Sequence, residues 1–402
     1  MRILSIATLF PSPVRPGFGI FVGNQMRAVQ ARGDVDLVVV SPVGMPPWPL
    51  SLMERYRRLR RIPEASAEPG LDVRYPRFTL FPLVGGDSNP RRIVSAVLPL
   101  ARKLHQEAPF DLVDAQFFFP DGPAAAVIAR ALSLPLTIKS RGADIHYWGS
   151  RGKVLAQMRA AAAQAAGMLA VSRALREDMI ALGMPGERIA LHYTGLDRER
   201  FHPGDRHRAR AEIAALTGLG ALAGEGALLV TPGALIARKG QRLAIAATAL
   251  IPGARLALAG AGEDEAALRA YAAQLGIAER VHFLGQVGHA TLPALLRAAD
   301  VVVLPSASEG LANVWVEALA CGTPLVIPDI GGAREVVQGP AAGRLVAREP
   351  GAIAAAVAQL LAAPPAQHAV AAHVAQFSWE ANAEQLVRFW GAITARAGAG
   401  TA

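Results

Sequence analysis

Residues 301–324 read VVVLPSASEGLANVWVEALACGTP, and the order of features in this stretch decides the fold class. The apolar run Val301–Leu304 predicts a buried strand, and the segment from Asn313 to Ala320 predicts a helix that Gly322 and Pro324 end. A strand, a polar loop and a helix form one unit of a parallel α/β sheet, where ligands bind beyond the carboxyl ends of the strands. We therefore expect the loop at residues 305–312 to face a ligand.

The same alternation of strands and alanine-rich helices runs along the chain in two series. In the first half the predicted strands are Ile3–Thr8, Leu37–Ser41, Leu112–Gln116 and Leu136–Lys139. After a polar, glycine-containing stretch at residues 203–226, the predicted strands are Ala227–Thr231, Arg255–Ala259, Val281–Leu284, Val301–Leu304 and Leu325–Ile327. We predict an α/β protein with two Rossmann-like domains, residues 1–200 and 201–378, that face each other across a cleft. A C-terminal helix within residues 379–402 is expected to return to the first domain.

Composition agrees with a folded two-domain protein. The chain has 402 residues, of which 52% are apolar and 18% are charged. No apolar run is long enough for a membrane-spanning helix, and the start of the chain reads as a first strand rather than a signal peptide. We therefore expect a cytoplasmic protein. The single cysteine, Cys321, lies among apolar residues and is expected in the core.

The net positive charge comes from one half of the chain. Residues 1–202 account for the whole net charge of +9, and residues 203–402 are neutral. Aromatic residues are only 6% of the chain, which argues against a nucleic-acid binder. Five arginines lie beside apolar residues in the segment Leu52–Ile62. This segment reads either as a patch that binds the inner face of an anionic membrane or as a solvated basic face.

Two carboxylates flank the start of the helix predicted at Asn313. Glu309 precedes this helix and Glu317 lies within it, eight positions later. Carboxylates so placed can accept hydrogen bonds from two vicinal diols, one on a sugar ring and one on a ribose. The free amides at the helix N-terminus are suited to bind a diphosphate. We expect the residues that approach this ligand to be Gly310, Leu311, Asn313 and Val314.

A second signal is the sequence Arg238-Lys239-Gly240, between the first strand of the second domain and its helix. Lys239 is one of only four lysines in the chain, and with Arg238 it can converge on a pyrophosphate. The nearby Gly260-Ala-Gly262 lacks the third glycine of a dinucleotide fingerprint. Asp34-Val-Asp36 has the spacing of an Asp-x-Asp metal clasp, but it stands at the entry to a strand, opposite the end where ligands are expected. Because no cluster has metal-ligand spacing, we predict neither a metal nor a resident cofactor.

Two places in the first domain are candidates for ligand contact. Arg141, Asp144 and His146 follow a predicted strand and are expected either to hold the transferred sugar or acceptor or to anchor their own loop. Gly19, in the loop after the first strand, either allows a ligand to approach the backbone or is a plain turn glycine.

These residues resemble the family-4 retaining glycosyltransferases with the GT-B fold, over nearly the whole chain. The glutamate pair is the signature of that family. Further resemblance lies in Val171-Ser-Arg-Ala-Leu, Tyr193-Thr-Gly-Leu-Asp197, Phe201-His-Pro203, Val281-His-Phe-Leu-Gly285 and Phe377-Ser-Trp-Glu380. The segment Phe10–Phe21 is most similar to members that build bacterial surface polysaccharides, such as teichuronic-acid-type transferases.

The resemblance implies a role for each candidate site residue of the second domain. Arg238 and Lys239 would hold the diphosphate of a UDP- or GDP-sugar, Glu309 the sugar hydroxyls and Glu317 the ribose diol. The acceptor would be a glycan or a lipid-linked sugar. Where many members have a histidine this chain has Arg141, so the acceptor-side role lies with either Arg141 or His146.

Other functions remain open at this point. A GT-B-type sugar-nucleotide epimerase would use a similar fold without an acceptor, and a non-catalytic module would bind a nucleotide-sugar or a membrane only. A Rossmann oxidoreductase is the weakest alternative because the glycine fingerprint is missing.

Overall fold

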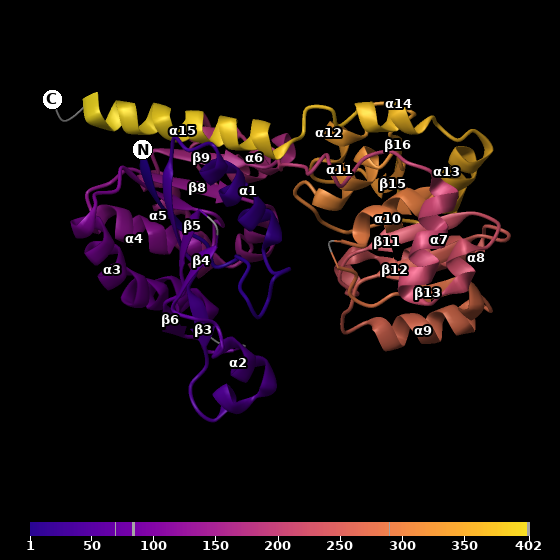
Figure 1. Cartoon of the computed structure of the whole chain (residues 1–402), viewed down its shortest axis with the longest axis horizontal. Coiled ribbons are helices and arrows are strands. Elements are labelled where there is room, and N and C mark those ends of the chain that lie inside the picture. The colour runs from indigo at the N-terminus through magenta and orange to yellow at the C-terminus, as the bar shows by residue number, and fades with distance from the viewer. Residues whose placement is uncertain (69, 83–84, 289, 400–402) are drawn as a thin grey trace. The chain divides into compact units, whose positions relative to one another are not determined.

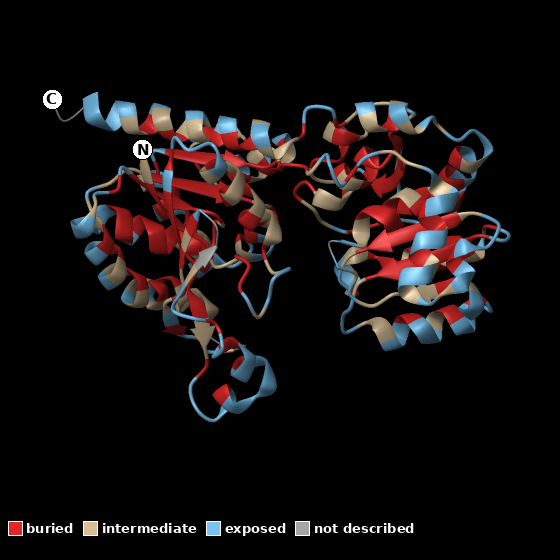
Figure 2. Ribbon diagram, viewed as in Figure 1, coloured by how far each residue is buried: buried red, intermediate tan, exposed pale blue. Residues whose placement is uncertain are grey.

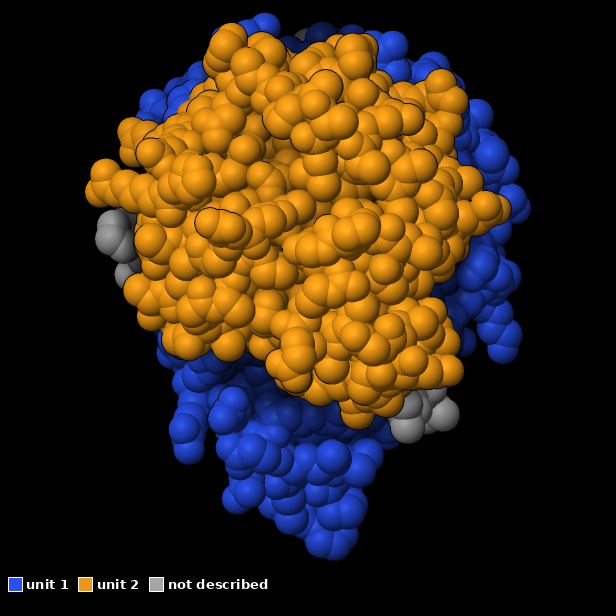
Figure 3. Space-filling view, turned by 90° about the vertical axis from the view of Figure 1, so that its right-hand side faces the viewer, with its two compact units in different colours: residues 1–195, 379–402 blue, residues 196–378 orange. Residues whose placement is uncertain are grey.

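The computed structural model of the chain describes residues 1–68, 70–82, 85–288 and 290–399. It divides into two compact units, which Figure 3 distinguishes by colour. The first unit comprises Met1–Gly195 together with Trp379–Ala402, and the second comprises Leu196–Ser378. The sequence places the boundary near residue 200, a few positions later than this division.

The first unit is built on an eight-stranded sheet in the order β10-β9-β8-β7-β1-β2-β5-β4 (Figure 1). All neighbours are parallel except β4, which is antiparallel to β5. The strands are β1 Arg2–Ile6, β2 Asp36–Val40, β4 Ala65–Glu68, β5 Leu71–Arg74, β7 Leu112–Ala115, β8 Leu136–Ser140, β9 Gly167–Ala170 and β10 Ile189–Leu191. A separate parallel pair joins β3 Val43–Met45 to β6 Arg77–Thr79.

Helices cover the sheet of the first unit on both faces. One face packs against α1 Ile20–Ala31 and α15 Trp379–Ala399, whose apolar residues share one core with β1, β2 and β5. The remaining helices are α2 Glu54–Leu59, α3 Asn89–Glu107, α4 Asp121–Ala131, α5 Gly152–Gln164 and α6 Arg173–Ala181, with the short turns η1 Leu50–Leu52, η2 Gly86–Ser88, η3 Asp144–Trp148 (a π-helix) and η4 Gly186–Arg188.

The C-terminal helix α15 is fixed to the first unit by apolar and polar contacts. Its Trp390 is fully buried and donates from Nε1 to Oδ1 of Asp114 at 3.2 Å. Its Asn382 donates to the carbonyl of Tyr193 at 2.6 Å and accepts at its own carbonyl from Nε2 of His192 at 2.9 Å. Because buried polar groups are costly when unpaired, these hydrogen bonds specify one docking position for the helix.

The second unit is built on a six-stranded, fully parallel sheet in the order β13-β12-β11-β14-β15-β16. The strands are β11 Leu228–Pro232, β12 Arg255–Ala259, β13 Val281–Phe283, β14 Val301–Val303, β15 Leu325–Pro328 and β16 Gly343–Val346. The helices are α7 Arg206–Thr217, α8 Gln241–Ala249, α9 Glu265–Gln274, α10 Leu292–Ala298, α11 Asn313–Ala320, α12 Ala333–Val336, α13 Pro350–Ala362 and α14 Gln367–Ala372, with the turns η5 Gly220–Ala223, η6 Ala237–Lys239 and η7 Ala278–Arg280.

The central strands of both sheets are buried along most of their length, as parallel sheets require (Figure 2). This burial explains why the continuous apolar runs of the sequence predict strands correctly. Each predicted strand is present, and α11 has the predicted bounds of Asn313–Ala320. The two Rossmann-like sheets are therefore confirmed. Among the described residues, no helix is long and apolar enough to cross a bilayer.

The contact between Gly195 and α15 gives a test of the docking. A Cβ on Gly195 would lie 2.1 Å from the Trp379 ring, whereas a Cβ on Gly391, within α15, would meet nothing within 4 Å. We expect Gly195→Ala to lower the free energy of unfolding by about 1–3 kcal/mol through this overlap. Gly391→Ala should instead raise it by about 0.5–1 kcal/mol through helix propensity. Thermal unfolding followed by circular dichroism compares the two, and equal shifts would contradict the docking.

Candidate active site

The site lies where the strand order of the second unit reverses. From β11 the chain adds β12 and β13 on one side of the sheet and then β14, β15 and β16 on the other. β11 and β14 are parallel neighbours, so their carboxyl ends meet at the same edge of the sheet. Such a switch point is where open α/β sheets bind ligands. The loop after β11 carries Arg238 and Lys239, and the loop after β14 carries Glu309.

Lys239 and Glu309 form an ion pair across these two loops. Lys239 Nζ lies 2.6 Å from Oε1 of Glu309, and both side chains are largely buried, at 16% and 10% exposed. The Arg238 guanidinium lies 3.6 Å from the same oxygen and donates to the carbonyl of Ser308 at 2.6 Å. The structure thus brings together three predicted site residues. Because the pair is desolvated, losing either partner would leave a costly buried charge.

The backbone of the loop after β14 is held from both sides by glycines. Gly240 has a φ of +73°, and a Cβ there would lie 2.3 Å from the carbonyl oxygen of Pro305. Gly331 has a φ of +49°, and a Cβ there would lie 2.2 Å from the carbonyl oxygen of Glu309. The amide of Ala307 donates to the carbonyl of Arg238 at 2.7 Å. The sequence analysis missed Gly331, although its place just after β15 was a usable signal.

The failed dinucleotide fingerprint has a structural role in this site. A Cβ on Gly260 would lie 1.9 Å from the carbonyl oxygen of Gly233, and one on Gly262 would lie 2.1 Å from that of Leu235. The two glycines therefore let the loop after β12 pack directly on the loop that leads to Arg238. The amide of Leu235 donates to the carbonyl of Ala261 at 3.1 Å, which closes this contact.

Glu317 lies in the second turn of α11, and its surroundings differ from those of Glu309. Its side chain is half-buried, and its carboxylate has no hydrogen-bond or ion-pair partner among the residues that the structure describes. Burial raises the pKa of Glu317 to about 7. A half-buried carboxylate without a partner among the described residues can accept hydrogen bonds from hydroxyl donors of a ligand.

The N-terminus of α11 is open to a ligand. Its N-cap residue, Ala312, has an extended backbone and offers no side-chain hydrogen bond to the helix. The first amides of a helix have no partner within the helix, and the helix dipole favours an anion there. Of the predicted amide donors, Gly310 and Leu311 are buried, whereas Asn313 and Val314 are half-buried.

In the first unit, Asp144 is already occupied by its own loop. The buried carboxylate accepts from the amides of Phe118, Arg141 and Gly142 at 2.8–3.1 Å and from the hydroxyl of Ser140 at 3.2 Å. Asp144 therefore fixes the turn that follows β8, which is the loop-anchoring alternative of the sequence analysis.

Arg141 and His146 differ in how they are held. The Arg141 guanidinium donates to the side chains of Gln25 and Gln116 at 2.8 and 2.6 Å, and burial lowers its pKa to about 10. His146 Nε2 lies 2.9 Å from Oδ2 of Asp178. Arg141 is thus tied to α1 and to the end of β7, whereas His146 is paired with α6.

Gly19 is required by the chain itself. It has a φ of +66°, and a Cβ there would lie 2.5 Å from the carbonyl carbon and oxygen of Leu9. The positive φ and this close approach to Leu9 explain the glycine without a ligand, so the turn alternative accounts for it.

Two buried groups of the first unit were missed by the sequence analysis. Asp121 accepts from the amide of Thr8 at 3.0 Å, between the ends of β1 and β7, and burial raises its pKa to about 7. Lys139 Nζ lies 2.6 Å from Nδ1 of His192, and burial lowers the pKa of this lysine well below its usual value. A lysine inside an apolar strand was a visible signal for the second of these groups.

The remaining sequence predictions concern residues outside the site. Asp36 pairs with Arg2 at 2.8 Å and Asp34 pairs with Arg32 at 2.8 Å, so both aspartates are engaged at the strand entry. Cys321 is buried, and burial raises the pKa of its thiol to about 12. It is therefore a core thiol, as predicted.

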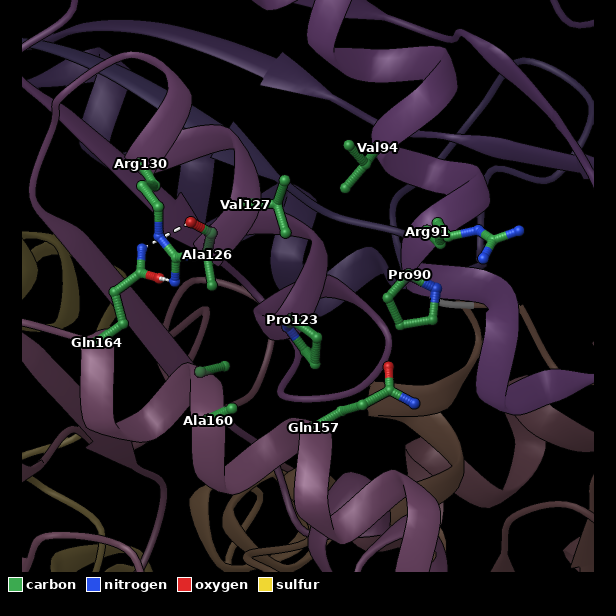
Figure 4. A pocket seen from close by; sticks show the side chains of 11 residues that line it. Pro90, Arg91, Val94, Pro123, Ala126, Val127, Arg130, Gln157, Ala160 and Gln164 are labelled. Carbon is green, nitrogen blue, oxygen red and sulfur yellow. Dashed lines mark hydrogen bonds between the residues drawn. The ribbon is translucent and has the colours of Figure 1, made fainter.

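An apolar groove of about 280 Å³ lies between α3, α4 and α5 of the first unit (Figure 4). At one end Arg130 donates to Gln164, and Gln164 donates to the carbonyl of Ala126 at 2.6 Å. None of the predicted site residues lines this groove, so we assign it no part in the reaction; the residues that line it include Pro90, Val94, Pro123, Val127, Gln157 and Ala160.

Two mainly parallel sheets, with a charged site at the switch point of the second, define the class of the protein as a two-unit, Rossmann-like α/β protein. Residues 17–195 match the family model described as a glycosyl transferase 4-like domain, and residues 220–385 match that of glycosyl transferases group 1. A putative teichuronic acid biosynthesis glycosyltransferase of Bacillus subtilis, TuaC, is 31% identical over 83% of this chain and 82% of its own length. The chain therefore belongs to the group 1 glycosyltransferases.

Other relatives agree with this assignment. A D-inositol 3-phosphate glycosyltransferase of Mycobacterium tuberculosis is 36% identical over 51% of this chain and 44% of its own length. Anabaena HepE in complex with UDP and glucose has a TM-score of 0.72 at 21% identity, covering 98% of this chain and all of that one. Sucrose-phosphate synthase from Thermosynechococcus elongatus has a TM-score of 0.78 at 20% identity, with the same coverage. At these low sequence identities, the two structures show only that the fold is shared.

The position of Glu317 predicts a pH-dependent stability. Its pKa rises from 4.5 to about 7 on folding, so the unfolded chain ionises this group first and stability falls as the pH rises through this window. We expect the wild type to lose about 1–3 kcal/mol relative to Glu317→Gln between about pH 5 and pH 8. Denaturant unfolding at both pH values measures this difference, with Glu212→Gln, an exposed carboxylate of α7, as control. A pH-independent difference would contradict the burial of Glu317.

Proposed function

We propose that the chain is a retaining, metal-independent glycosyltransferase that moves a sugar from a nucleotide-diphosphate sugar to a glycan or lipid-linked acceptor. The proposed setting is bacterial surface-polysaccharide synthesis at the inner face of the cell membrane. The observation that carries this proposal is the desolvated Lys239–Glu309 pair at the switch point of the second unit, beside an uncapped helix N-terminus.

In the proposed complex, the donor lies along the loops that follow β11 and β14. The diphosphate binds between the cations of Arg238 and Lys239 and the first amides of α11, because all of these groups attract an anion. Glu309 accepts from hydroxyls of the transferred sugar. Glu317, which has no partner among the described residues, accepts from the ribose diol. Each charge-assisted bond contributes about 1.5–3 kcal/mol.

The proposed reaction breaks the bond between the anomeric carbon and the diphosphate oxygen and forms a bond to the acceptor oxygen on the same face. The acceptor proton passes to the departing diphosphate, so no protein base is needed. Lys239 and Arg238 stabilise the charge that grows on the leaving diphosphate, and Glu309 lies beside a ring that becomes positively charged. Catalysis is then mainly electrostatic, by groups that are in place before the substrate binds.

The names of the relatives support the kind of donor and acceptor. HepE of Anabaena has been crystallised with UDP and with UDP-glucose, which favours a UDP-sugar as the first donor to test. The Bacillus subtilis relative is named for teichuronic acid biosynthesis, which favours a surface polysaccharide as the product.

Substitution of Lys239 tests the proposed function. We expect Lys239→Gln to lower nucleotide release from the accepted donor by about 10²–10³-fold, because one preorganised cation at the leaving group is lost. The matched control is Arg208→Gln, which removes an exposed cation of α7 in the same unit. Nucleotide release is measured with UDP-, GDP- and ADP-sugars in the presence of a chelator, and the product anomer is identified by NMR.

Several outcomes would contradict the proposal. An absolute requirement for a divalent metal would exclude the metal-independent mechanism, and an inverted product would exclude retention. Conversion of the donor with no transfer to any acceptor would point to an epimerase. Equal activity of the Lys239 and Arg208 variants would remove the diphosphate role.

A further inference from the structure

An apolar surface is exposed in the segment between β3 and β4 of the first unit. Figure 1 shows this segment, with α2, as a lobe beyond the ends of β3 and β6. Within six consecutive residues, four large apolar side chains are exposed, at 43–78% of their surface. They are Trp48, Leu50, Leu52 and Met53. Exposed apolar side chains gathered in this way mark an interaction surface.

The lobe is firmly attached to the core, so its exposed side chains have fixed positions. Tyr56, Leu59 and Ile62 are buried in the main apolar core of the first unit. The Arg77 guanidinium donates to the carbonyls of Leu59, Arg60 and Ile62 at 3.3, 3.0 and 2.8 Å. The inner face of α2 therefore packs on the core of the first unit. The four exposed apolar side chains, which precede α2, take no part in this packing.

The outer face of the same lobe is strongly basic. Five exposed arginines follow Met53, at positions 55, 57, 58, 60 and 61. The only acidic residue between Pro46 and Ile62 is Glu54, which lies 3.3 Å from Arg57 and 3.4 Å from Arg58. Arg60 and Arg61 have no side-chain ion pair among the described residues. The lobe thus presents an excess of positive charge beside its apolar side chains.

We propose that this lobe docks on an anionic lipid bilayer, with Trp48, Leu50, Leu52 and Met53 entering the interface and the five arginines lying on the lipid headgroups. Tryptophan and leucine side chains partition into the headgroup boundary, and each arginine near it is attracted by anionic lipid. An excess of positive charge beside exposed apolar side chains is complementary to a negatively charged lipid surface. This docking surface deepens the proposed function, because it would hold the enzyme beside a lipid-linked acceptor, but vesicle binding itself requires no donor.

The test is co-sedimentation of the full chain with phosphatidylcholine vesicles, with and without phosphatidylglycerol. We expect binding to the anionic vesicles only, with a steep loss at high salt. Trp48→Ser/Leu50→Ser and, separately, Arg60→Gln/Arg61→Gln should each weaken binding by about tenfold or more. The matched apolar control is Leu216→Ser/Leu250→Ser, which changes two exposed leucines of the second unit, at 59% and 58%. The matched basic control is Arg91→Gln/Arg102→Gln on α3.

Tryptophan fluorescence gives a second readout, which reports whether the Trp48 side chain itself enters the lipid. Trp48 is 78% exposed, whereas Trp315 and Trp390 are fully buried. Anionic vesicles should shift the emission to the blue and brominated lipid should quench it, and both effects should be lost in Trp48→Phe.

Equal vesicle binding by the lobe variants and their controls would overturn the proposal. So would a wild-type protein that does not bind anionic vesicles and instead binds a protein through this lobe. Nucleotide release without vesicles is measured on every variant. Its retention in the lobe variants would show that they fold. Vesicle binding without any donor turnover would reject the proposed function and leave the docking surface standing.

Discussion

The parallel pairing of β11 with β14 is the constraint on which the site depends. These strands are neighbours in the sheet although β12 and β13 lie between them in the sequence. Their carboxyl ends therefore bring Lys239 within 2.6 Å of Glu309, a residue seventy positions away. The side chains of Lys239 and Glu309 are only 16% and 10% exposed, so these two charges meet in a largely desolvated place where electrostatic interactions are strong.

The glycines around the site follow from this arrangement, and titratable groups lie near the strand ends of both units. Gly240 and Gly331 lie on either side of the loop after β14, where a Cβ would collide with the backbone. Glu317 has no partner among the residues that the structure describes, and burial raises its pKa to about 7. In the first unit, Asp121 occupies the corresponding position between the ends of β1 and β7, where that sheet also reverses its order. Both units thus place titratable groups at a switch point.

Much of this fold could be predicted from the sequence because buried parallel strands are continuous apolar runs. The chain order of Arg238, Lys239 and Glu309 at strand ends also predicted their convergence. Short strands such as β9 and β10 were missed because their few residues carry no distinct pattern. Loop anchoring by Asp144 was one of two alternatives open from the sequence, and the contact with the Phe118 amide belongs to the folded chain. The requirement for Gly331 depends on its contact with Glu309, a residue distant in sequence, which spacing alone does not reveal.

A crystal structure of the chain with a non-transferable nucleotide-sugar tests the proposed donor site most directly. We expect diphosphate oxygens within hydrogen-bond distance of Lys239 and Arg238, beside the first amides of α11, with the ribose diol on Glu317. A ligand bound away from the ends of β11 and β14, or a diphosphate held only through a divalent metal, would rule out this donor site.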